Sequence, residues 1–433
     1  MESIWSQTTE HPNYQTLNKD IKTDVLIIGA GIAGLLCGYM LKKRGIECVL
    51  VDADRVCGKI TKDTTAKITL QHGLIYSKIA KYFNTEYAKL YLKAQLEAIE
   101  QYQTLCKDID CDYKQLDSYV YSIRDRKKIE DEVGVLKSIG YPARLVNDLP
   151  LPLEIKGAFG VSGQAQFHPL KFLYAISRDL TVYENTRVAR FVSDGALTER
   201  GKITCKRVIV ATHFPFLNKH GSYFLKMYQH RSYVIALENA AQLNGMYVDE
   251  DLKGLSFREC DGLLLIGGGS HRTGKKGGNW NELSAIAHKH YPGAKEICRW
   301  ATQDCMTLDS VPYIGRYCKG TPDLYVATGF NKWGMSNAMV SALLLADLIT
   351  GKKNAYERVF SPSRTILRPQ LAINAAESIV GLITPTAPRC THLGCALKYN
   401  KQEHSWDCSC HGSRFTDKGE LINNPATKAK TNL

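Results

Sequence analysis

The fold of this chain is decided by residues 25–34, which read Val-Leu-Ile-Ile-Gly-Ala-Gly-Ile-Ala-Gly. A short apolar run leads directly into glycines spaced Gly-x-Gly-x-x-Gly, and the segment behind them has a helical pattern as far as Gly45. A second apolar run, 48–51, ends on Asp52. A strand, a glycine turn, a helix and an acid at about this separation are together typical of a dinucleotide-binding unit.

Each part of this unit has a chemical reason. Gly29 allows the tight turn, Gly31 lets the backbone approach a pyrophosphate, and Gly34 lets the helix lie close to the strand. The helix N-terminus then faces the phosphates, and Asp52 accepts hydrogen bonds from ribose hydroxyls. The alternative is an ordinary buried strand, turn and helix without a ligand. The agreement of all the parts favours dinucleotide binding.

Length and hydropathy set limits on the rest of the molecule. A chain of 433 residues is expected to form two or three domains. No run of about 18 uninterrupted apolar residues occurs, and residues 1–23 are polar, without the apolar core of a signal peptide. The sequence therefore predicts a soluble, cytoplasmic protein with no membrane span.

Charge and cysteine content narrow the choice of partners. The formal net charge is +13, but the basic residues are dispersed and lack the interleaved aromatics of a nucleic-acid groove, so no nucleic acid is expected. A solvated basic surface is the plain interpretation. The functional one is a docking face for an acidic electron carrier such as ferredoxin or flavodoxin. Of 14 cysteines, most are scattered singly and are expected to be reduced thiols, whereas four fall within 390–410.

Three further segments suit a flavin. Thr64-Thr65-Ala66-Lys67 brings hydroxyls and an ammonium close to the second strand, although a capped turn would also explain it. The strand 208–212 ends in small residues, as a parallel strand beside a cofactor would. The loop 329–335 enters a helix over 336–349, whose N-terminus would stabilise the negative charge of a reduced flavin.

These segments, with Gln166-Phe167-His168-Pro169 and 309–315, resemble the FAD-dependent amine and amino-acid oxidoreductases of the glycine oxidase and D-amino-acid oxidase type over about residues 3–350. The resemblance implies an α/β Rossmann-like FAD domain and a discontinuous antiparallel-β substrate domain. The FAD domain is expected at 1–80, 150–220 and 305–350, and the substrate domain at 81–149 and 221–304. In this family a hydride passes from a carbon bearing an amine to the flavin, so the expected substrate is an amine or amino acid.

The resemblance also indicates which residues bind FAD. The expected contacts are Gly29, Gly31, Gly34, Asp52, Ala53, Arg55, Thr64, Thr65, Lys67, Val188, Ala211, Thr212, Gly315, Gly329, Trp333, Gly334 and Met335. Substrate contacts vary within the family, so the catalytic residues stay unknown, and His72, His271 and Arg272 stay open between substrate contact and a structural role. Some relatives attach the flavin through a cysteine near Cys305, although a lone cysteine is more often a small buried residue.

The chemistry changes after residues 351–387, which are expected to form a linker with one helical piece at 371–379. Two loops, Cys390-Thr391-His392 and Cys408-Ser409-Cys410-His411, could then hold a metal. Two Cys and two His would also make a tetrahedral zinc site. Iron and sulfur are favoured because the loops offer a thiolate pair and an imidazole pair, because glycines let backbone amides reach bridging sulfides, and because Ser413 can donate to a sulfide.

These loops resemble the Rieske 2Fe-2S motif, which makes residues 388–433 a small all-β cluster-binding module. The resemblance implies that Cys390 and Cys408 bind one iron, that His392 and His411 bind the other, and that Cys395 and Cys410 form a disulfide. Ser409 stands where the family often has proline, and the strands that usually precede the first loop are not evident. The fusion itself resembles a known group of FAD-dependent oxidoreductases.

The two cofactors together predict a dehydrogenase. A flavin accepts two electrons and the cluster passes one at a time, so electrons would run from an amine through FAD to the cluster and on to a carrier. One alternative is a reductase fed through the cluster by an external carrier. Others are a non-enzymatic redox sensor or electron-transfer module, and an oxidase with a structural zinc that reduces dioxygen directly.

Overall fold

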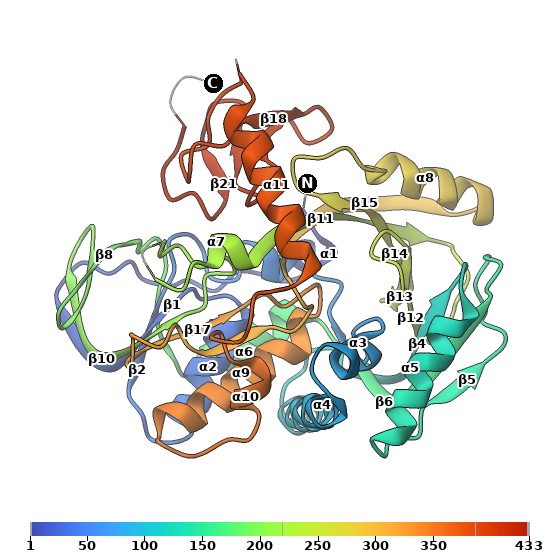
Figure 1. Ribbon diagram of the computed structural model, residues 1–433, viewed down its shortest axis with the longest axis horizontal. Helices are drawn as coiled ribbons and strands as arrows, with labels where there is room; N and C mark the ends of the chain where they lie inside the picture. The colour runs from blue at the N-terminus through green and yellow to red at the C-terminus, as the bar shows by residue number, and fades with distance from the viewer. Residues whose placement is uncertain (1, 219, 386, 431–433) are drawn as a thin grey trace.

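The computed structural model describes residues 2–218, 220–385 and 387–430, and it is built around three sheets. In Figure 1 an eight-stranded sheet with its helices lies on the left, and a nine-stranded sheet lies on the right. A four-stranded sheet stands above both, beside the C-terminus.

The eight-stranded sheet carries the glycine turn. Its order is β16-β17-β10-β1-β2-β7, and a β8–β9 hairpin pairs with the start of β10. The strands are β1 (Ile21–Ile28), β2 (Cys48–Val51), β7 (Thr181–Tyr183), β8 (Val188–Val192), β9 (Gly195–Thr198), β10 (Lys202–Val210), β16 (Tyr313–Arg316) and β17 (Leu324–Thr328). Helices α2 (Ile32–Lys42), α6 (Pro169–Ser177) and α9 (Gly334–Ile349) belong to this part, with α2 packed against both others. The central strands are parallel and covered on both faces, which explains their continuous apolar runs.

The nine-stranded sheet has the order β15-β11-β14-β13-β12-β4-β6-β3, with β5 paired to β6. Its strands are β3 (Lys67–Ile68), β4 (Lys114–Ser122), β5 (Arg144–Val146), β6 (Gly157–Gln166), β11 (Met227–Glu238), β12 (Met246–Asp249), β13 (Ser256–Cys260), β14 (Leu263–Arg272) and β15 (Lys295–Thr307). Its neighbouring helices are α3 (Ile75–Tyr82), α4 (Thr85–Leu105), α5 (Arg126–Ser138) and α8 (Asn279–His290). The pairing is antiparallel except between β12 and β4. Because β3 and β6 pair here, parts of 1–80 and 150–220 join the substrate sheet and not the FAD sheet in which they were expected.

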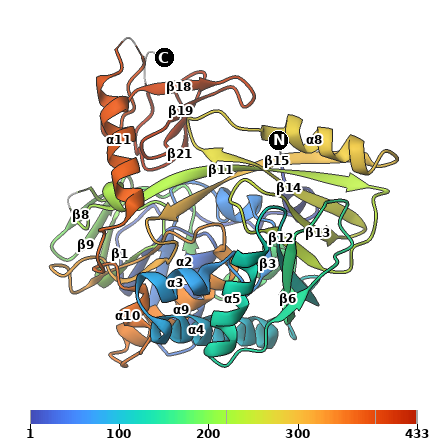
Figure 2. The same ribbon diagram turned by 45° about the vertical axis from the view of Figure 1, so that its right-hand side comes forward.

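The C-terminal part is more ordered than the sequence indicated. Strands β18 (Leu397–Asn400), β19 (Ser405–Cys408), β20 (Arg414–Thr416) and β21 (Leu421–Asn423) form a meander. The expected linker contains α10 (Glu357–Phe360) and α11 (Pro369–Ile383), and Arg364 anchors it through a buried ion pair with Asp309 at 2.7 Å. We call α11 and residues 387–430 the C-terminal module. Figure 2 shows this module and α8 on the same side of β11.

The N-terminal segment is anchored by Trp5. Its indole is fully buried and donates to the carbonyl of Thr64 at 2.7 Å, and the Arg258 guanidinium lies over the ring. The remaining short elements are α1 (Ile4–Gln7), a 3-10 turn at Ile60–Asp63 and α7 (Tyr223–Lys226). In the described parts of the chain, no helix is long and apolar enough to cross a membrane.

Candidate functional site

One cavity of about 1450 Å³ runs from the glycine turn to the underside of the nine-stranded sheet. All the residues expected to contact FAD line it except Gly34 and Gly315. Residues from six separate stretches of sequence therefore meet in one space. Their individual contacts with FAD stay predictions, since they follow from placement alone.

The glycine turn is shaped by close backbone approaches. Gly29 has a left-handed φ of +105°, and a Cβ there would lie 2.5 Å from the carbonyl oxygen of Ala211 on β10. A Cβ on Gly34 would lie 1.8 Å from the carbonyl oxygen of Gly29. Gly34 thus acts by letting α2 lie against the turn and not by lining the cavity. The N-terminus of α2 opens on the cavity at Gly31, which suits a phosphate.

Asp52 closes the turn from the end of β2. Its carboxylate accepts from the backbone N–H of Ala30 at 2.7 Å and of Asp54 at 3.0 Å. Burial raises the pKa of Asp52 to about 6 although these hydrogen bonds favour the charged form. A carboxylate has further lone pairs, so this side chain can still accept from hydroxyls of a ligand in the cavity.

Lys67 is the buried cation of the Thr64–Lys67 segment. Its Nζ donates to the Thr65 hydroxyl at 3.0 Å. Burial, followed by the charge of nearby Arg258, lowers the pKa of Lys67 to about 7. An anionic or electron-rich ligand edge in the cavity would oppose that shift, which suits the role expected of this segment.

The loop before α9 is held rigidly. Asn331 and Lys332 both have left-handed backbones, with φ of 53° and 74°. The Asn331 side chain fixes this shape by accepting from the Thr307 N–H at 2.8 Å and donating to the carbonyl of Gly329. Such strain persists only where the surroundings enforce it, and here it aims Trp333 and the N-terminus of α9 at the cavity.

His72 supports this loop. Its ring stacks on Trp333 with centroids 5.0 Å apart, and its nitrogens contact the Tyr91 hydroxyl at 2.6 Å and the Ser336 hydroxyl at 2.9 Å. Burial lowers the pKa of His72 to about 3, so the imidazole is neutral. With both nitrogens engaged inside the protein, His72 positions Trp333.

Sequence reasoning missed several polar groups of the cavity. Lys332 donates to the Ser270 hydroxyl and to the carbonyl of Leu252, each at 3.1 Å, and Asp304 lines the cavity nearby. Burial raises the pKa of Asp304 to about 6. The loop pattern singled out residues 329–335, but which side chains turn inward depends on the neighbouring sheet. Cys305 also lines the cavity, and burial raises its thiol pKa well above the usual range, which keeps it a neutral thiol.

The second site lies in the C-terminal module, where the two cluster histidines come together. The rings of His392 and His411 lie 5.0 Å apart, and the Nδ1 atom of each is buried without a partner. His392 Nε2 contacts the Asn218 side-chain oxygen at 3.0 Å, and His411 hydrogen-bonds the backbone of Phe224. Burial lowers both pKa values, to about 3 and about 4. Both imidazoles are thus neutral, with outer nitrogens occupied and Nδ1 free to bind a metal.

The sulfur side of this site fits the same chemistry. Cys390 and Cys408 are buried, each begins a tight turn closed by a glycine N–H (Gly394 N–H and Gly412 N–H, respectively), and the thiols interact with each other. The Ser413 hydroxyl hydrogen-bonds the Cys390 sulfur and accepts from the Ala426 N–H at 3.0 Å. Two thiols, two unpartnered imidazole nitrogens and glycine-opened loops are the donor set of a 2Fe-2S cluster with mixed ligation.

The expected disulfide is not formed in this structure. Cys395 and Cys410 are both free, and their sulfur atoms lie within 4.8 Å of each other and of Cys408. Helix α11 covers them, since a Cβ on Gly381 would lie 2.5 Å from the Cys410 sulfur. The pairing stays a prediction that the proximity of the two thiols allows.

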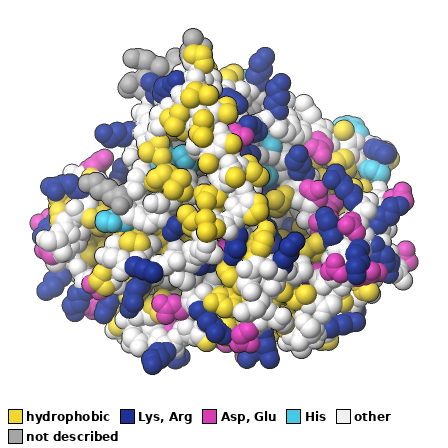
Figure 3. All heavy atoms as spheres, in the orientation of Figure 1, with side chains coloured by type: hydrophobic (Ala, Val, Ile, Leu, Met, Phe, Trp, Pro, Cys, Tyr) yellow, Lys and Arg dark blue, Asp and Glu magenta, His cyan; other side chains and the backbone are white. Residues whose placement is uncertain are grey.

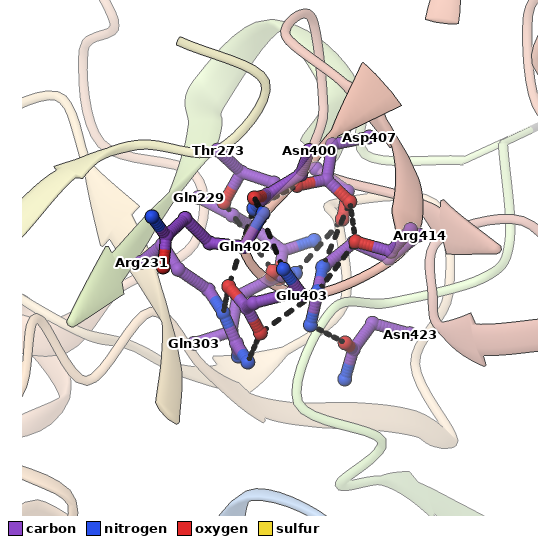
Figure 4. Close-up of polar contacts among 12 residues, drawn as sticks. Gln229, Arg231, Thr273, Gln303, Asn400, Gln402, Glu403, Asp407, Arg414 and Asn423 are labelled. Carbon is purple, nitrogen blue, oxygen red and sulfur yellow. Dashed lines mark hydrogen bonds and ion pairs between the residues drawn. The ribbon is translucent and has the colours of Figure 1, made fainter. Parts of the chain in front are cut away.

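A buried charge network joins the module to the nine-stranded sheet (Figure 4). Glu403 accepts from Arg231 of β11 and from Arg414 of β20, and Arg414 also donates to Asp407 at 2.9 Å. All four side chains are nearly inaccessible to water. The two guanidinium groups hold the pKa of Glu403 at about 2 despite its burial. No local pattern in the sequence indicated these pairs.

Side chains of the nine-stranded sheet also hold backbone carbonyls of the second cluster loop. Gln229 donates to the carbonyl of His411 at 2.7 Å, and Gln303 donates to that of Gly412 at 2.8 Å. Arg272 donates to the carbonyl of Ser409 at 2.9 Å, while His271 contacts the Tyr233 hydroxyl at 3.0 Å. Arg272 therefore serves the interface between the two parts, and His271 supports it indirectly through Tyr233, whose hydroxyl donates to Glu403 at 2.9 Å.

Comparison with known protein families agrees with both sites. Residues 24–348 match the family model described as FAD dependent oxidoreductase, and residues 363–432 match that of the Rieske [2Fe-2S] domain. YhfW of Bacillus subtilis (strain 168), which bears the name of a Rieske 2Fe-2S iron-sulfur protein, is 34% identical over 99% of this chain and 96% of its own. The gamma-glutamylputrescine oxidoreductase of Escherichia coli (strain K12) is 22% identical over 86% of this chain and 95% of its own.

Solved structures share the larger part of the fold. L-proline dehydrogenase from P. horikoshii has a TM-score of 0.68 at 19% identity, covering 80% of this chain and 98% of that one. Glycine oxidase from Geobacillus kaustophilus has a TM-score of 0.65 at 20% identity, covering 80% of this chain and 99% of that one. The two-sheet body is thus a fold that both of these enzymes share.

Proposed function

Because this chain belongs to the family of FAD-dependent oxidoreductases and carries a Rieske [2Fe-2S] domain, with FAD and a 2Fe-2S cluster as cofactors, we propose that it is an amine or amino-acid dehydrogenase. Electrons would pass from the substrate through FAD to the cluster and then to a carrier. When bound, FAD would accept a hydride from the carbon that bears the amine, and the cluster would pass electrons singly. We place this reaction in the cytoplasm.

One observation carries this proposal: the short segment between β10 and α7 reaches both sites. Ala211, Thr212 and His213 line the flavin cavity. The next residue, Phe214, packs its ring edge-on against His392 with centroids 6.4 Å apart. The cavity wall and a cluster ligand are thus separated by a few covalent bonds and one ring contact.

Helix α7, which follows this segment, contacts the second histidine. Phe224 lies edge-on to His411 with ring centroids 6.2 Å apart, and Asn218 contacts His392. The histidine side of the cluster site therefore faces the flavin body, with His411 buried and His392 partly exposed. This arrangement supports electron transfer between the two cofactors within one chain.

The substrate class is supported by the relatives and by the cavity. The names of the similar proteins include a proline dehydrogenase, a glycine oxidase and a gamma-glutamylputrescine oxidoreductase, all of which concern amines or amino acids. Beneath the nine-stranded sheet, Lys332 and Asp304 offer one charge of each sign to a ligand. An amine with a second charged group fits such a pocket.

The direction of electron flow limits the choice of carrier. Rieske clusters have potentials of about −150 to +300 mV, whereas plant-type ferredoxins lie near about −400 mV. A ferredoxin would therefore donate to this cluster and not accept from it, which matches the reductase alternative. The proposed dehydrogenase needs an acceptor of higher potential, such as a small haem or copper protein.

The test is anaerobic reduction by a panel of amines and amino acids. A substrate should bleach the flavin absorbance and then produce the low-temperature EPR signal of a reduced 2Fe-2S cluster. In Cys408→Ser the flavin should bleach without that signal, while Cys318→Ser, which alters a partly buried thiol outside the cluster loops, should behave like the parent protein.

Other outcomes would select the alternatives. Bleaching without cluster reduction in the parent protein, or zinc in place of iron on metal analysis, would contradict the electron relay. Cluster and flavin reduction by reduced ferredoxin, with no response to any amine, would identify a reductase. Redox responses without turnover of any compound would leave a sensor.

A further inference from the structure

The two sides of the cluster site differ in what covers them. His411 is only 4% exposed and lies against Phe224, whereas His392 is partly exposed and contacts Asn218. The flavin body therefore covers most of the histidine side of the cluster site while the module is docked. The opposite side offers a second protein a more open approach.

The opposite side is covered by a single helix. The Ala396 N–H donates to the carbonyl of Gly381 at 2.8 Å, and the Cys410 sulfur lies 3.6 Å from the carbonyl oxygen of Glu377. Gly381 leaves room for Cys410 because any side chain there would clash with the sulfur. The C-terminal half of α11 thus separates the cysteine side of the cluster loops from solvent by one helix thickness.

The solvent side of this helix is strongly apolar. Its large exposed side chains, Ile373, Ile379, Val380, Leu382 and Ile383, form what we call the outer face of α11, and Ile383 reaches 72% exposure. Leu393, next to the ligand His392, adds a further exposed apolar side chain at 39%. Figure 3 shows hydrophobic side chains gathered along α11 in the upper centre of the molecule. Exposed apolar patches of this kind mark interaction sites.

The charged groups placed at this face leave an excess of positive charge. The only acid on α11, Glu377, is paired with Lys275 at 2.6 Å. Arg389 binds the carbonyls at the end of the helix, and the exposed Lys428 lies beside Thr391, whose hydroxyl donates to its carbonyl. A partner with an acidic rim would be attracted to this edge.

We propose that the outer face of α11, together with Leu393, is the docking site of a small acidic one-electron carrier protein. This inference rests on the proposed dehydrogenase. Oxidation of the amine to an imine releases two electrons and two protons, so two oxidised carrier molecules each dock in turn and leave with one electron, while the protons go to solvent. The carrier meets the cluster on the side that the flavin body leaves open.

Two other occupants fit less well. A second copy of the chain would cover the open side of the cluster and leave no outlet for electrons. Helices that lie on membranes carry Lys and Arg on their polar face, whereas α11 has none between Pro369 and Ile383 and its inner face packs on the cluster loops.

The test uses the full-length holoprotein with its cluster reduced chemically, so it does not depend on finding a substrate. An oxidised acidic c-type cytochrome is the probe, and stopped-flow absorbance follows its reduction. The double variant Ile379→Asp, Ile383→Asp should lower the second-order rate at least tenfold, and the parent rate should fall as salt is added. Leu145→Asp, at another exposed apolar position, on β5, should leave the rate unchanged.

Two controls distinguish a loss of carrier docking from damage to the cluster. The EPR spectrum of the reduced cluster should be the same in all variants, and the parent protein should reduce a basic c-type cytochrome more slowly than the acidic one. An unchanged rate in the double variant would overturn the proposal. So would a dimer of the parent protein that the double variant dissociates, or binding to phosphatidylcholine–phosphatidylglycerol vesicles that the double variant loses. Failure of the dehydrogenase itself would appear separately, as a cluster that no amine reduces.

Discussion

The polarity of each face of the C-terminal module is the opposite of what its surroundings would suggest. The face pressed against the nine-stranded sheet contains the charged side chains Arg231, Glu403, Arg414 and Asp407, all buried. The outer face of α11, which meets water, is made of isoleucine, leucine and valine. The interface between the module and the sheet is thus charged, whereas the solvent-exposed face of α11 is apolar.

This contrast teaches how each face works. Buried ion pairs add little net stability compared with apolar packing, but they permit one geometry, because any displacement leaves charges unpaired. The inner face therefore fixes the histidines of the cluster site against the flavin body. An apolar face without such pairs tolerates partners that come and go, which suits a carrier.

The largest effect on this contrast is expected for Glu403→Ala, which disrupts the charge network of the inner face. Removal of this carboxylate leaves Arg231 and Arg414 buried without their shared partner, which is expected to cost about 3–5 kcal/mol. The module should lose its cluster absorbance at a markedly lower urea concentration than the flavin body unfolds. Glu420→Ala, an exposed carboxylate of the same module, is the matched control. Equal urea midpoints for both variants would show that the network does not hold the module.

Acid should destabilise the same interface between the module and the sheet, by a slightly smaller free energy. The pKa of Glu403 falls from 4.5 to about 2 on folding, which corresponds to about 3 kcal/mol. Because the folded pKa is lowered, this stability is complete above about pH 5 and is lost as the pH falls towards 2. Urea midpoints of the module measured across this range should follow that course, and Glu403→Gln should flatten it. A parent protein with no acid dependence would contradict the assignment.

The packing of α11 on the cysteines, between these two faces, can be tested with Gly381→Ala. The new Cβ would lie 2.5 Å from the Cys410 sulfur, so α11 must shift outward at a cost of about 1–3 kcal/mol. Thermal unfolding of the module should begin earlier, with the cluster still inserted. Gly293→Ala, where a Cβ would meet nothing, controls for the loss of a glycine. If the two variants melt alike, α11 does not lie tightly on the cysteines.

The smallest effect is expected on the outer face. Ile379→Ser replaces a side chain that is 58% exposed, so the free energy of unfolding should change by less than about 0.5 kcal/mol. Chemical denaturation followed by circular dichroism measures this change. A loss of several kcal/mol would mean that the side chain is covered in solution and that the outer face of α11 is already occupied.

Local patterns explain which features the sequence could predict. The glycine turn, Asp52 and the four expected cluster ligands lie in short motifs whose spacing reflects chemistry within one turn or loop, so they could be proposed from the sequence alone. The family and both cofactors followed from them. The boundaries of the two sheets did not, because β3 and β6 are assigned by pairing with distant strands and not by their own residues.

The parts that were missed depend on long-range contacts. Arg231 and Glu403 are 172 residues apart, and no sequence pattern around either residue predicts the pair. Lys332 was within a loop of interest, but its direction is set by Ser270 and the turn at Leu252. Residues 351–387 read as a linker because prolines bracket a modest helix, whereas packing on Cys395 and Cys410 extends that helix to Ile383.

The strand β21 and the residues behind it have a consequence for how the holoprotein is made. Residues 421–424 and 426–428 of the module form part of the wall of the flavin cavity, and Asn424 donates to the carbonyls of Thr212 and Phe214. The flavin pocket is therefore complete only when the C-terminal module lies against the flavin body. One chain segment thus serves two prosthetic groups, so removal of the module would open the flavin cavity to water as well as abolish the cluster site.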